Sequence, residues 1–169
     1  SLFQPSQRSL YEHQEKAVKT VIKDKQNIVV ATGTGSGKTE CFLIPMLDML
    51  LKEEDNLSSP GVRSLILYPM NALVNDQVKR LRKLLCRQET VRIRFGFYTS
   101  RTETKPKDAE ESLRKELQAY EGKELQELFT AAEKQNLDLS TKDKLVKKAI
   151  AKITSIQAIS REEIWDNPP

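Results

Sequence analysis

Cysteine, histidine and long apolar runs are all scarce in this sequence of 169 residues. Its two cysteines, Cys41 and Cys86, lie far apart, and with one histidine they give neither a disulfide framework nor zinc-ligand spacing. No apolar run approaches the ~18 residues of a membrane-spanning helix, and the first residues lack the pattern of a signal peptide. These absences predict a soluble protein of a reducing compartment, most simply the cytoplasm.

Charge, by contrast, is abundant. Charged residues make up 31% of the chain, and the formal net charge is +4. This excess of Lys and Arg is mild for the length, so it favours a polyanionic partner without identifying one. The length suits a single domain with its own hydrophobic core.

Apolar residues recur with a changing period along residues 9–98. Helical spacing predicts helices over residues 9–23, 38–50 and 72–87, and short β-branched or alternating runs predict strands at 28–31, 64–68 and 91–98. Helices that alternate with strands indicate an α/β fold with a parallel sheet and flanking helices. Residues 103–159 differ, because Gly and Pro nearly vanish and charges crowd in, which predicts an insertion of two or three amphipathic helices.

A glycine-rich segment lies between the first predicted strand and the helix at 38–50. Glycine permits backbone torsions that bring N–H groups close to phosphate oxygens, and the helix N-terminus adds its positive dipole end. Lys38 is placed to reach the β and γ phosphates, and the Thr39 hydroxyl is suited to Mg²⁺. The segment therefore predicts a P-loop that binds ATP with Mg²⁺; its residues are Thr34, Gly35, Ser36, Gly37, Lys38, Thr39 and Glu40.

The stretch from Thr32 to Glu40 resembles motif I of superfamily 2 helicases, the DEAD/DEAH-box group. Thr32 departs from the strict P-loop pattern, which places glycine there, and this departure marks a subtype. The segment around Gln14 resembles the family's Q-motif, in which a glutamine amide reads the adenine edge. The resemblance implies a RecA-like P-loop fold, ATP hydrolysis with Lys38 and Thr39 as catalytic residues, and an adenine contact by Gln14.

Two further stretches resemble the family's nucleic-acid face. The turn that contains Pro69 and Asn71 is similar to motif Ia, which binds a nucleic-acid backbone in that family. Gln77 follows on the next helix. Met70 replaces the usual threonine there, and Asn71 is placed to substitute for its hydroxyl. Thr99 and Arg101 fall in a turn after the third predicted strand, where the family again faces the nucleic acid. The amino-acid sequence of these motifs is similar to that of large bacterial Lhr-like or DISARM-type phage-defence DNA helicases. This resemblance implies DNA rather than RNA as the partner.

Several parts of such a motor are not in the sequence. We find no D-E-x-[HD] motif after an apolar strand, no S-A-T motif and no second RecA-like lobe. The expectation is therefore that residues 1–102 form the N-terminal part of an ATP-binding lobe, that 103–159 are the helical insertion, and that 160–169 return toward a further strand. We expect exposed apolar surface, a partner or further chain that completes the sheet, and negligible ATPase activity of this chain alone.

Two other functional classes compete with the helicase hypothesis. One is a small P-loop kinase, although no arginine-rich lid or acceptor site is visible. The other is a non-enzymatic nucleotide-binding or docking module, in which residues 103–157 supply the interaction surface. A sugar or nucleoside that stimulates turnover would favour the first, and loss of a partner upon deletion of the helical insertion would favour the second.

Overall fold

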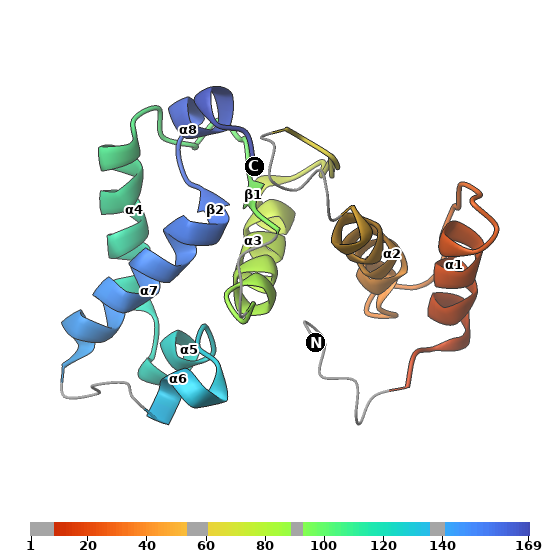
Figure 1. The fold of residues 1–169 in the computed structure, drawn as a ribbon, viewed down its shortest axis with the longest axis horizontal. Coiled ribbons are helices and arrows are strands. Elements are labelled where there is room, and N and C mark those ends of the chain that lie inside the picture. The colour runs from red at the N-terminus through yellow and green to blue at the C-terminus, as the bar shows by residue number, and fades with distance from the viewer. Residues whose placement is uncertain (1–8, 54–60, 89–92, 136–140) are drawn as a thin grey trace. The chain divides into compact units, whose positions relative to one another are not determined.

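A computed structural model describes residues 9–53, 61–88, 93–135 and 141–169 (Figure 1). The chain divides into two compact units, of which the first holds residues 9–53 and the second holds the other described residues. Along the described part of the chain, every helix is too short or too polar to cross a bilayer.

The first unit consists of two packed helices, α1 (Glu12–Ile22) and α2 (Lys38–Lys52). Gln14 and Ala17 are the buried residues of α1, and the buried face of α2 includes Cys41 and Leu47. Both helices lie where the apolar spacing predicts them, although α1 begins at Glu12 and not at residue 9. The side chain of Gln14 reaches back to the N-cap residue, because its Oε1 accepts a hydrogen bond from the Tyr11 backbone N–H at 2.9 Å.

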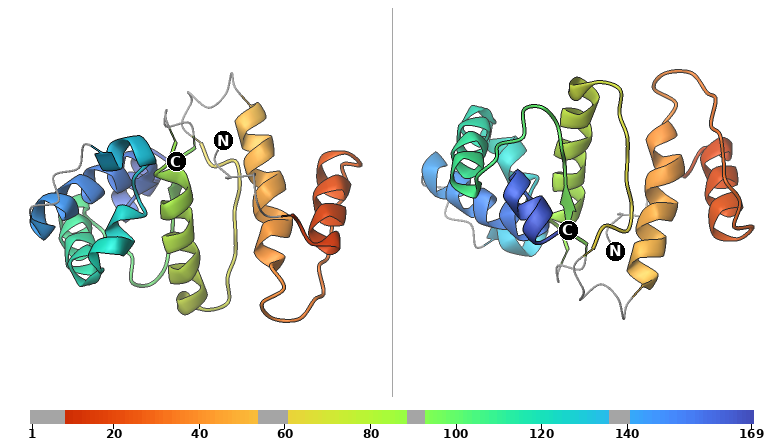
Figure 2. Two further views of the ribbon diagram at one scale, coloured as in Figure 1. Left: turned by 90° about the horizontal axis from the view of Figure 1, so that it is seen from below. Right: turned by 90° about the horizontal axis from the view of Figure 1, so that it is seen from above.

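The second unit is mostly helical. In all three views its helices α4 to α8 lie on one side of α3 (Figures 1 and 2). The longest of them, α7, is amphipathic and buries the apolar stripe that includes Leu145, Ala149 and Ile153. It packs against α3, α4 and α5, which places it at the centre of this unit's core. The elements are α3 (Asn71–Leu85), β1 (Phe95–Gly96), α4 (Pro106–Ala119), α5 (Gly122–Gln126), α6 (Ala131–Gln135), α7 (Lys142–Ile156), β2 (Gln157–Ala158) and α8 (Arg161–Asp166).

The predicted strands are largely wrong. Residues 28–31 and 64–68 form no strand, and Val29, Leu65 and Leu67 are 97%, 76% and 81% exposed instead of buried. The third prediction, 91–98, shortens to β1, and residues 91 and 92 lie outside the described residues. A parallel strand is stabilised by hydrogen-bonded neighbours, and of the three predicted strands only the third, which contains β1, has one in the described structure. These apolar side chains form the kind of exposed apolar surface that the sequence predicts.

The strand that pairs with β1 comes from an unexpected place. β2 lies at the end of the predicted helical insertion and pairs with β1 in parallel, with Phe95 opposite Gln157 and Gly96 opposite Ala158. Residues 160–169, expected as a return segment, contain α8, which Ser160 caps by accepting a hydrogen bond from the Glu163 N–H. The two-stranded parallel sheet therefore joins the chain on either side of the insertion.

Buried polar contacts tie α3 to the helices that pack against it. Arg82 is 4% exposed; its Nε donates to Gln157 Oε1 at 2.7 Å, and its Nη1 pairs with Glu116 at 2.9 Å. The Tyr120 hydroxyl donates to the same Glu116 oxygen at 2.9 Å, and burial together with that carboxylate raises the pKa of Tyr120. Arg82 thus links α3 to α4 and to β2 through one guanidinium.

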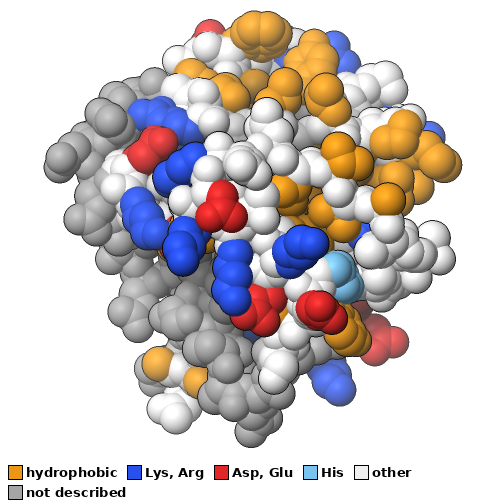
Figure 3. Space-filling model, turned by 90° about the vertical axis from the view of Figure 1, so that its right-hand side faces the viewer, with side chains coloured by type: hydrophobic (Ala, Val, Ile, Leu, Met, Phe, Trp, Pro, Cys, Tyr) orange, Lys and Arg blue, Asp and Glu red, His pale blue; other side chains and the backbone are white. Residues whose placement is uncertain are grey.

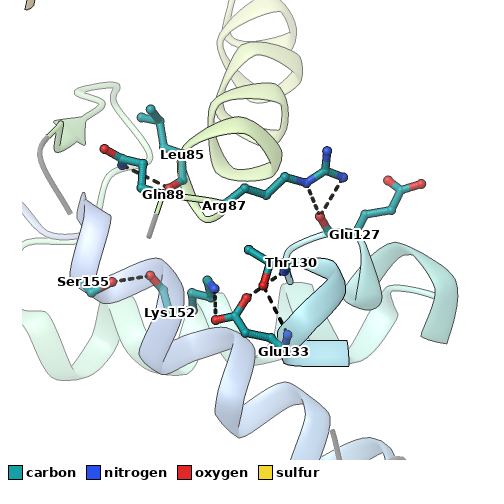
Figure 4. A network of polar contacts seen from close by, with 8 residues as sticks. All are labelled: Leu85, Arg87, Gln88, Glu127, Thr130, Glu133, Lys152 and Ser155. Atoms are coloured by element: carbon teal, nitrogen blue, oxygen red, sulfur yellow. Dashed lines mark hydrogen bonds and ion pairs between the residues drawn. The ribbon is translucent and has the colours of Figure 1, made fainter. Parts of the chain in front are cut away.

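A second set of contacts joins the end of α3 to α5, α6 and α7 (Figure 4). The guanidinium of Arg87 donates to the backbone carbonyl of Glu127, and Lys152 pairs with Glu133. The Thr130 hydroxyl accepts from the Glu133 N–H at 3.2 Å, so Thr130 caps α6 while the Glu133 carboxylate faces Lys152. Burial opposes ionisation of Glu133, but hydrogen bonds from Lys152 and Thr130 outweigh it and lower the pKa of the carboxyl.

Candidate functional site

The glycine-rich loop of the first unit has two glycines in the left-handed region. Gly35 has φ 77° and Gly37, the N-cap of α2, has φ 80°. At Gly37 a side chain is disfavoured for two reasons: the positive φ strains other residues, and an added Cβ would lie 2.4 Å from Gln14 Nε2, which would have to move. Gly33 differs, since an added Cβ would meet nothing within 4 Å. The conformation of the loop thus depends on glycine at specific positions.

Lys38 is the first residue of α2, and its side chain folds back over the loop. Its Nζ donates to the carbonyls of Thr32 and Gly33, at 2.7 and 2.6 Å. An ammonium has three donors, so these two bonds leave one for an oxygen of a ligand. The loop therefore holds a positive charge at the start of a helix, which is the electrostatic arrangement that a phosphate group requires.

Gln14 connects α1 to the loop. Its Nε2 donates to the Gly37 carbonyl at 2.9 Å, while its Oε1 accepts from Tyr11 N–H. By count, the amide retains one N–H and one acceptor lone pair, which are the two groups that an adenine edge would use. The side chain is only 5% exposed, so a base would have to approach along its remaining edge.

Other predicted residues of the loop lie around this centre. The hydroxyls of Ser36 and Thr32 are 2.6 Å apart, and Thr34 is exposed in the turn. Thr39 and Glu40 lie in the first turn of α2, at the N-terminal end of the helix. The following residue, Cys41, faces the core, and burial raises the pKa of its thiol. The structure thus brings together every residue that the sequence analysis assigned to nucleotide binding.

The sequence analysis assigns no chemistry to His13, the residue before Gln14. His13 Nε2 lies 3.0 Å from the Ser36 carbonyl, and its ring stacks on that of Tyr11 with centroids 5.8 Å apart. Figure 3 shows Lys, Arg, Asp and Glu side chains on one part of the face that it draws, with hydrophobic side chains gathered on another part. The position of His13 one residue before Gln14 was the available signal, since neighbouring residues at a helix start can reach the same loop.

The residues predicted to contact nucleic acid lie in the second unit, in two groups. Pro69 and Asn71 are exposed at the start of α3, with Met70 as its N-cap, and Gln77 lies farther along the same helix. Thr99 and Arg101 share the turn after β1, where the Arg101 N–H donates to the Thr99 hydroxyl at 3.2 Å. The side chain of Arg101 is exposed.

An arginine that the sequence analysis did not single out fastens that turn. Arg161, the first residue of α8, donates from Nε to the Thr102 carbonyl at 2.8 Å and from Nη2 to the Ser100 carbonyl at 3.2 Å. The Thr102 hydroxyl donates to the Phe97 carbonyl and accepts from the Thr99 N–H. No sequence signal was available for Arg161, because its partners are about sixty residues away along the chain.

Among the described residues, no group of three or more His, Cys, Asp or Glu side chains could hold a metal ion by itself. The donor set at the loop is instead a lysine, hydroxyls and backbone N–H groups. Such a set suits a metal that arrives with phosphate oxygens, because Mg²⁺ in nucleotide sites takes most of its ligands from phosphates and water.

Comparisons with known proteins identify relatives of this chain. Over 106 residues the chain is 45% identical to Druantia protein DruE of Escherichia coli (strain UMEA 4076-1), a match that covers 54% of this chain and 6% of that protein. It is 41% identical over 71 residues to the uncharacterized ATP-dependent helicase MJ1574 of Methanocaldococcus jannaschii, covering 42% of this chain and 9% of that protein. It is 38% identical over 72 residues to the ATP-dependent RNA helicase DBP9 of Meyerozyma guilliermondii, covering 43% of this chain and 12% of that protein.

The chain therefore spans a small fraction of the curated relatives that it matches. No solved structure matches it. The family model for the DEAD/DEAH box helicase matches residues 11–149, which include Gln14, the glycine-rich loop, α3 and most of the helical insertion. That family has a RecA-like P-loop fold, and the resemblance inferred from the loop and from Gln14 is confirmed. On this match, the chain belongs to the DEAD/DEAH box helicase family.

Proposed function

We propose that this chain is the ATP-binding portion of a nucleic-acid-dependent helicase or translocase. The observation that carries the proposal is the Lys38 ammonium, which lies on the carbonyls of Thr32 and Gly33 at the start of α2. In the proposed complex Lys38 contacts the β and γ phosphates. Backbone N–H groups of Gly35 and Gly37 and the first turn of α2 contact the remaining phosphate oxygens.

Mg²⁺ would enter this site together with the nucleotide. The metal supplies charge neutralisation for phosphoryl transfer to water. The Thr39 hydroxyl serves as its protein ligand, Glu40 and Thr34 line the same loop, and Gln14 reads the adenine. Lys38 and Thr39 thereby act as catalytic residues of the whole protein, since both hold the group that reacts.

Nucleic acid binds, in this proposal, to the second unit. Pro69, Asn71 and Gln77 on α3 and Thr99 and Arg101 after β1 contact the phosphate backbone. Such contacts release counterions, so affinity falls with salt. We take DNA as the preferred polymer, as the resemblance to DNA helicases implies; because one relative is named an RNA helicase, RNA is the comparison to make.

We propose that the 169 residues alone bind ATP without significant turnover. They contain no D-E-x-[HD] motif to position the attacking water and no second lobe to supply an arginine finger, which contributes roughly 10³–10⁵ in rate in other P-loop enzymes. In the proposed longer protein, residues 103–159 are an insertion into this lobe. A further strand or a partner pairs there with residues 28–31 and 64–68.

The test is titration of a fluorescent ATP analogue with and without Mg²⁺. The substitution Lys38→Ala should weaken binding about tenfold or more, because a charge-assisted hydrogen bond to phosphate is lost. Lys16→Ala is the matched control, since Lys16 is an exposed lysine on α1. Equal affinity of the Lys38→Ala and parent chains would overturn the assignment of the loop, and nucleic-acid-stimulated turnover by the chain would overturn its proposed inactivity.

A further inference from the structure

Two aromatic side chains stand exposed beside the turn after β1. Tyr98 is 57% exposed and Trp165, on α8, is 73% exposed. Their rings meet edge to face, with centroids 6.3 Å apart and an interplanar angle of 81°. Aromatic rings in such pairs are ordinarily buried, because each removes a large apolar area from water. Two adjacent rings left in water are therefore an unusual surface feature in this unit.

The pair is held in place by the surrounding backbone. The guanidinium of Arg161 lies over the Tyr98 ring at 5.2 Å and donates to carbonyls of the turn that follows Tyr98. On the other side, α8 packs on β1 so closely that a Cβ added to Gly96 would lie 3.1 Å from Ile164. Both the turn and α8 are thus fixed, which presents Tyr98 and Trp165 as a preorganised platform.

Charges around the rings favour one kind of occupant. Arg101 is exposed and lies three residues after Tyr98, in the turn whose carbonyls accept hydrogen bonds from Arg161. Glu162 and Asp166 lie on α8 beside Trp165, so a polyanion would approach with its phosphates on the Arg101 side. A ligand with apolar flat faces and a regularly spaced negative backbone matches this arrangement, and single-stranded nucleic acid has both.

We propose that Tyr98 and Trp165 form a base-stacking platform for single-stranded nucleic acid, with Arg101 on the adjacent phosphate. This inference rests on the proposed nucleic-acid binding and adds to it a contact with bases where that proposal has contacts with the backbone. Stacking on an aromatic face is tolerant of sequence, since every base has such a face. The platform would hold a strand without selecting its sequence.

Trp165 provides a direct readout, because it is the single tryptophan of the chain. A base stacked on its ring should quench its fluorescence. The probes are a single-stranded oligothymidylate and an abasic oligomer with the same sugar-phosphate backbone and length. We expect the oligothymidylate to quench Trp165 and the abasic oligomer to bind more weakly with little quenching. Equal quenching by both, or none by either, would overturn the platform.

Variants separate the stacking from the backbone contacts. Tyr98→Ala and Trp165→Ala should each weaken oligothymidylate binding, measured by anisotropy of a labelled oligomer, about fivefold or more. Trp165→Phe should retain most of the affinity, and Met49→Ala, which trims an exposed apolar residue of α2, should have no effect. Circular dichroism spectra should match those of the parent, because both aromatic side chains are largely exposed.

The failure of this inference differs from the failure of the proposed function. Salt-sensitive binding that is unchanged in both alanine variants would remove the platform and leave the backbone contacts standing. Absence of binding to either oligomer under low salt would contradict both. A Trp165→Phe variant as weak as Trp165→Ala would show that the loss is not one of stacking, and would also overturn the platform.

Discussion

The side-chain amide of Gln14 donates a hydrogen bond to the backbone carbonyl of Gly37, at 2.9 Å, and joins the start of α1 to the start of α2. The same amide accepts from the Tyr11 N–H, so one residue both caps a helix and holds the glycine-rich loop. A residue that the sequence suggests only as a reader of adenine thus also shapes the loop before any nucleotide arrives.

Two substitutions of Gln14 should separate these contacts. Gln14→Glu keeps an acceptor for the Tyr11 N–H but sets a carboxylate against the Gly37 carbonyl, whereas Gln14→Ala removes both bonds. Each net hydrogen bond contributes about 0.5–1.5 kcal/mol, so we expect Gln14→Ala to lower stability by about 1–3 kcal/mol in urea unfolding. Both variants should bind the ATP analogue more weakly than the parent. Parent-like affinity and stability of Gln14→Glu would show that the bond to Gly37 contributes nothing.

Gly37 and Gly33 offer a matched pair of glycine substitutions. Gly37→Ala places a Cβ against Gln14 and holds a non-glycine residue at φ 80°, a conformation that costs roughly 1–2 kcal/mol for other residues. Gly33→Ala meets neither obstacle. We expect a lower melting temperature and weaker ATP-analogue binding for Gly37→Ala, and values near the parent for Gly33→Ala. A melting temperature as low for Gly33→Ala as for Gly37→Ala would refute this argument.

Loss of the buried guanidinium of Arg82 should lower the free energy of unfolding more than loss of an exposed arginine that also pairs with a glutamate. Arg82→Met leaves Gln157 without its donor, and Gln157 Nε2 already lacks a partner among the described residues. We expect a loss of about 2–4 kcal/mol in urea unfolding. Arg114→Met is the control: its pair with Glu110 is exposed and 3.4 Å long, so its loss should be about 1 kcal/mol or less. Equal losses in the two variants would contradict the role assigned to Arg82.

The thiol of Cys86 predicts a loss of stability at alkaline pH. Burial raises the pKa of Cys86 to about 12, whereas an unfolded cysteine titrates near about 8.5. Between these values the folded state binds the extra proton, so stability falls as pH rises, by at most about 1.4 kcal/mol per pH unit from this group. Urea unfolding followed by circular dichroism between about pH 8 and pH 11 should show a shallower decline for Cys86→Ala than for the parent. A decline of the same steepness in both would exclude Cys86 as its source.

Helices were predictable from the sequence and strands were not, for a physical reason. The apolar spacing of residues such as Leu43 and Leu47, or Val78 and Leu85, is local information, and α2 and α3 lie where it indicates. Strand formation at Val29 or Leu65 depends on a neighbour that local sequence does not specify, and in the described structure β1 pairs with Gln157 and Ala158 instead. The turn before α2 with its left-handed glycines was predictable because Gly35, Gly37 and Lys38 are nearly contiguous in the sequence. Arg161 and Trp165 were not, since each acquires its role only by folding next to Tyr98.

The pairing of β1 with β2 also has a consequence for the residues that connect the two strands. Arg161 N–H donates to the Glu103 carbonyl at 2.9 Å and Glu162 N–H to the Thr104 carbonyl at 3.2 Å, so the two ends of residues 105–160 are clamped side by side. A connection whose ends already touch can be lengthened in its loops with little change in closure entropy, which grows only slowly with loop length. An insertion into one of these loops would therefore leave the strand pair and the core helix α7 in place, which makes the loops suitable positions for grafting a foreign domain.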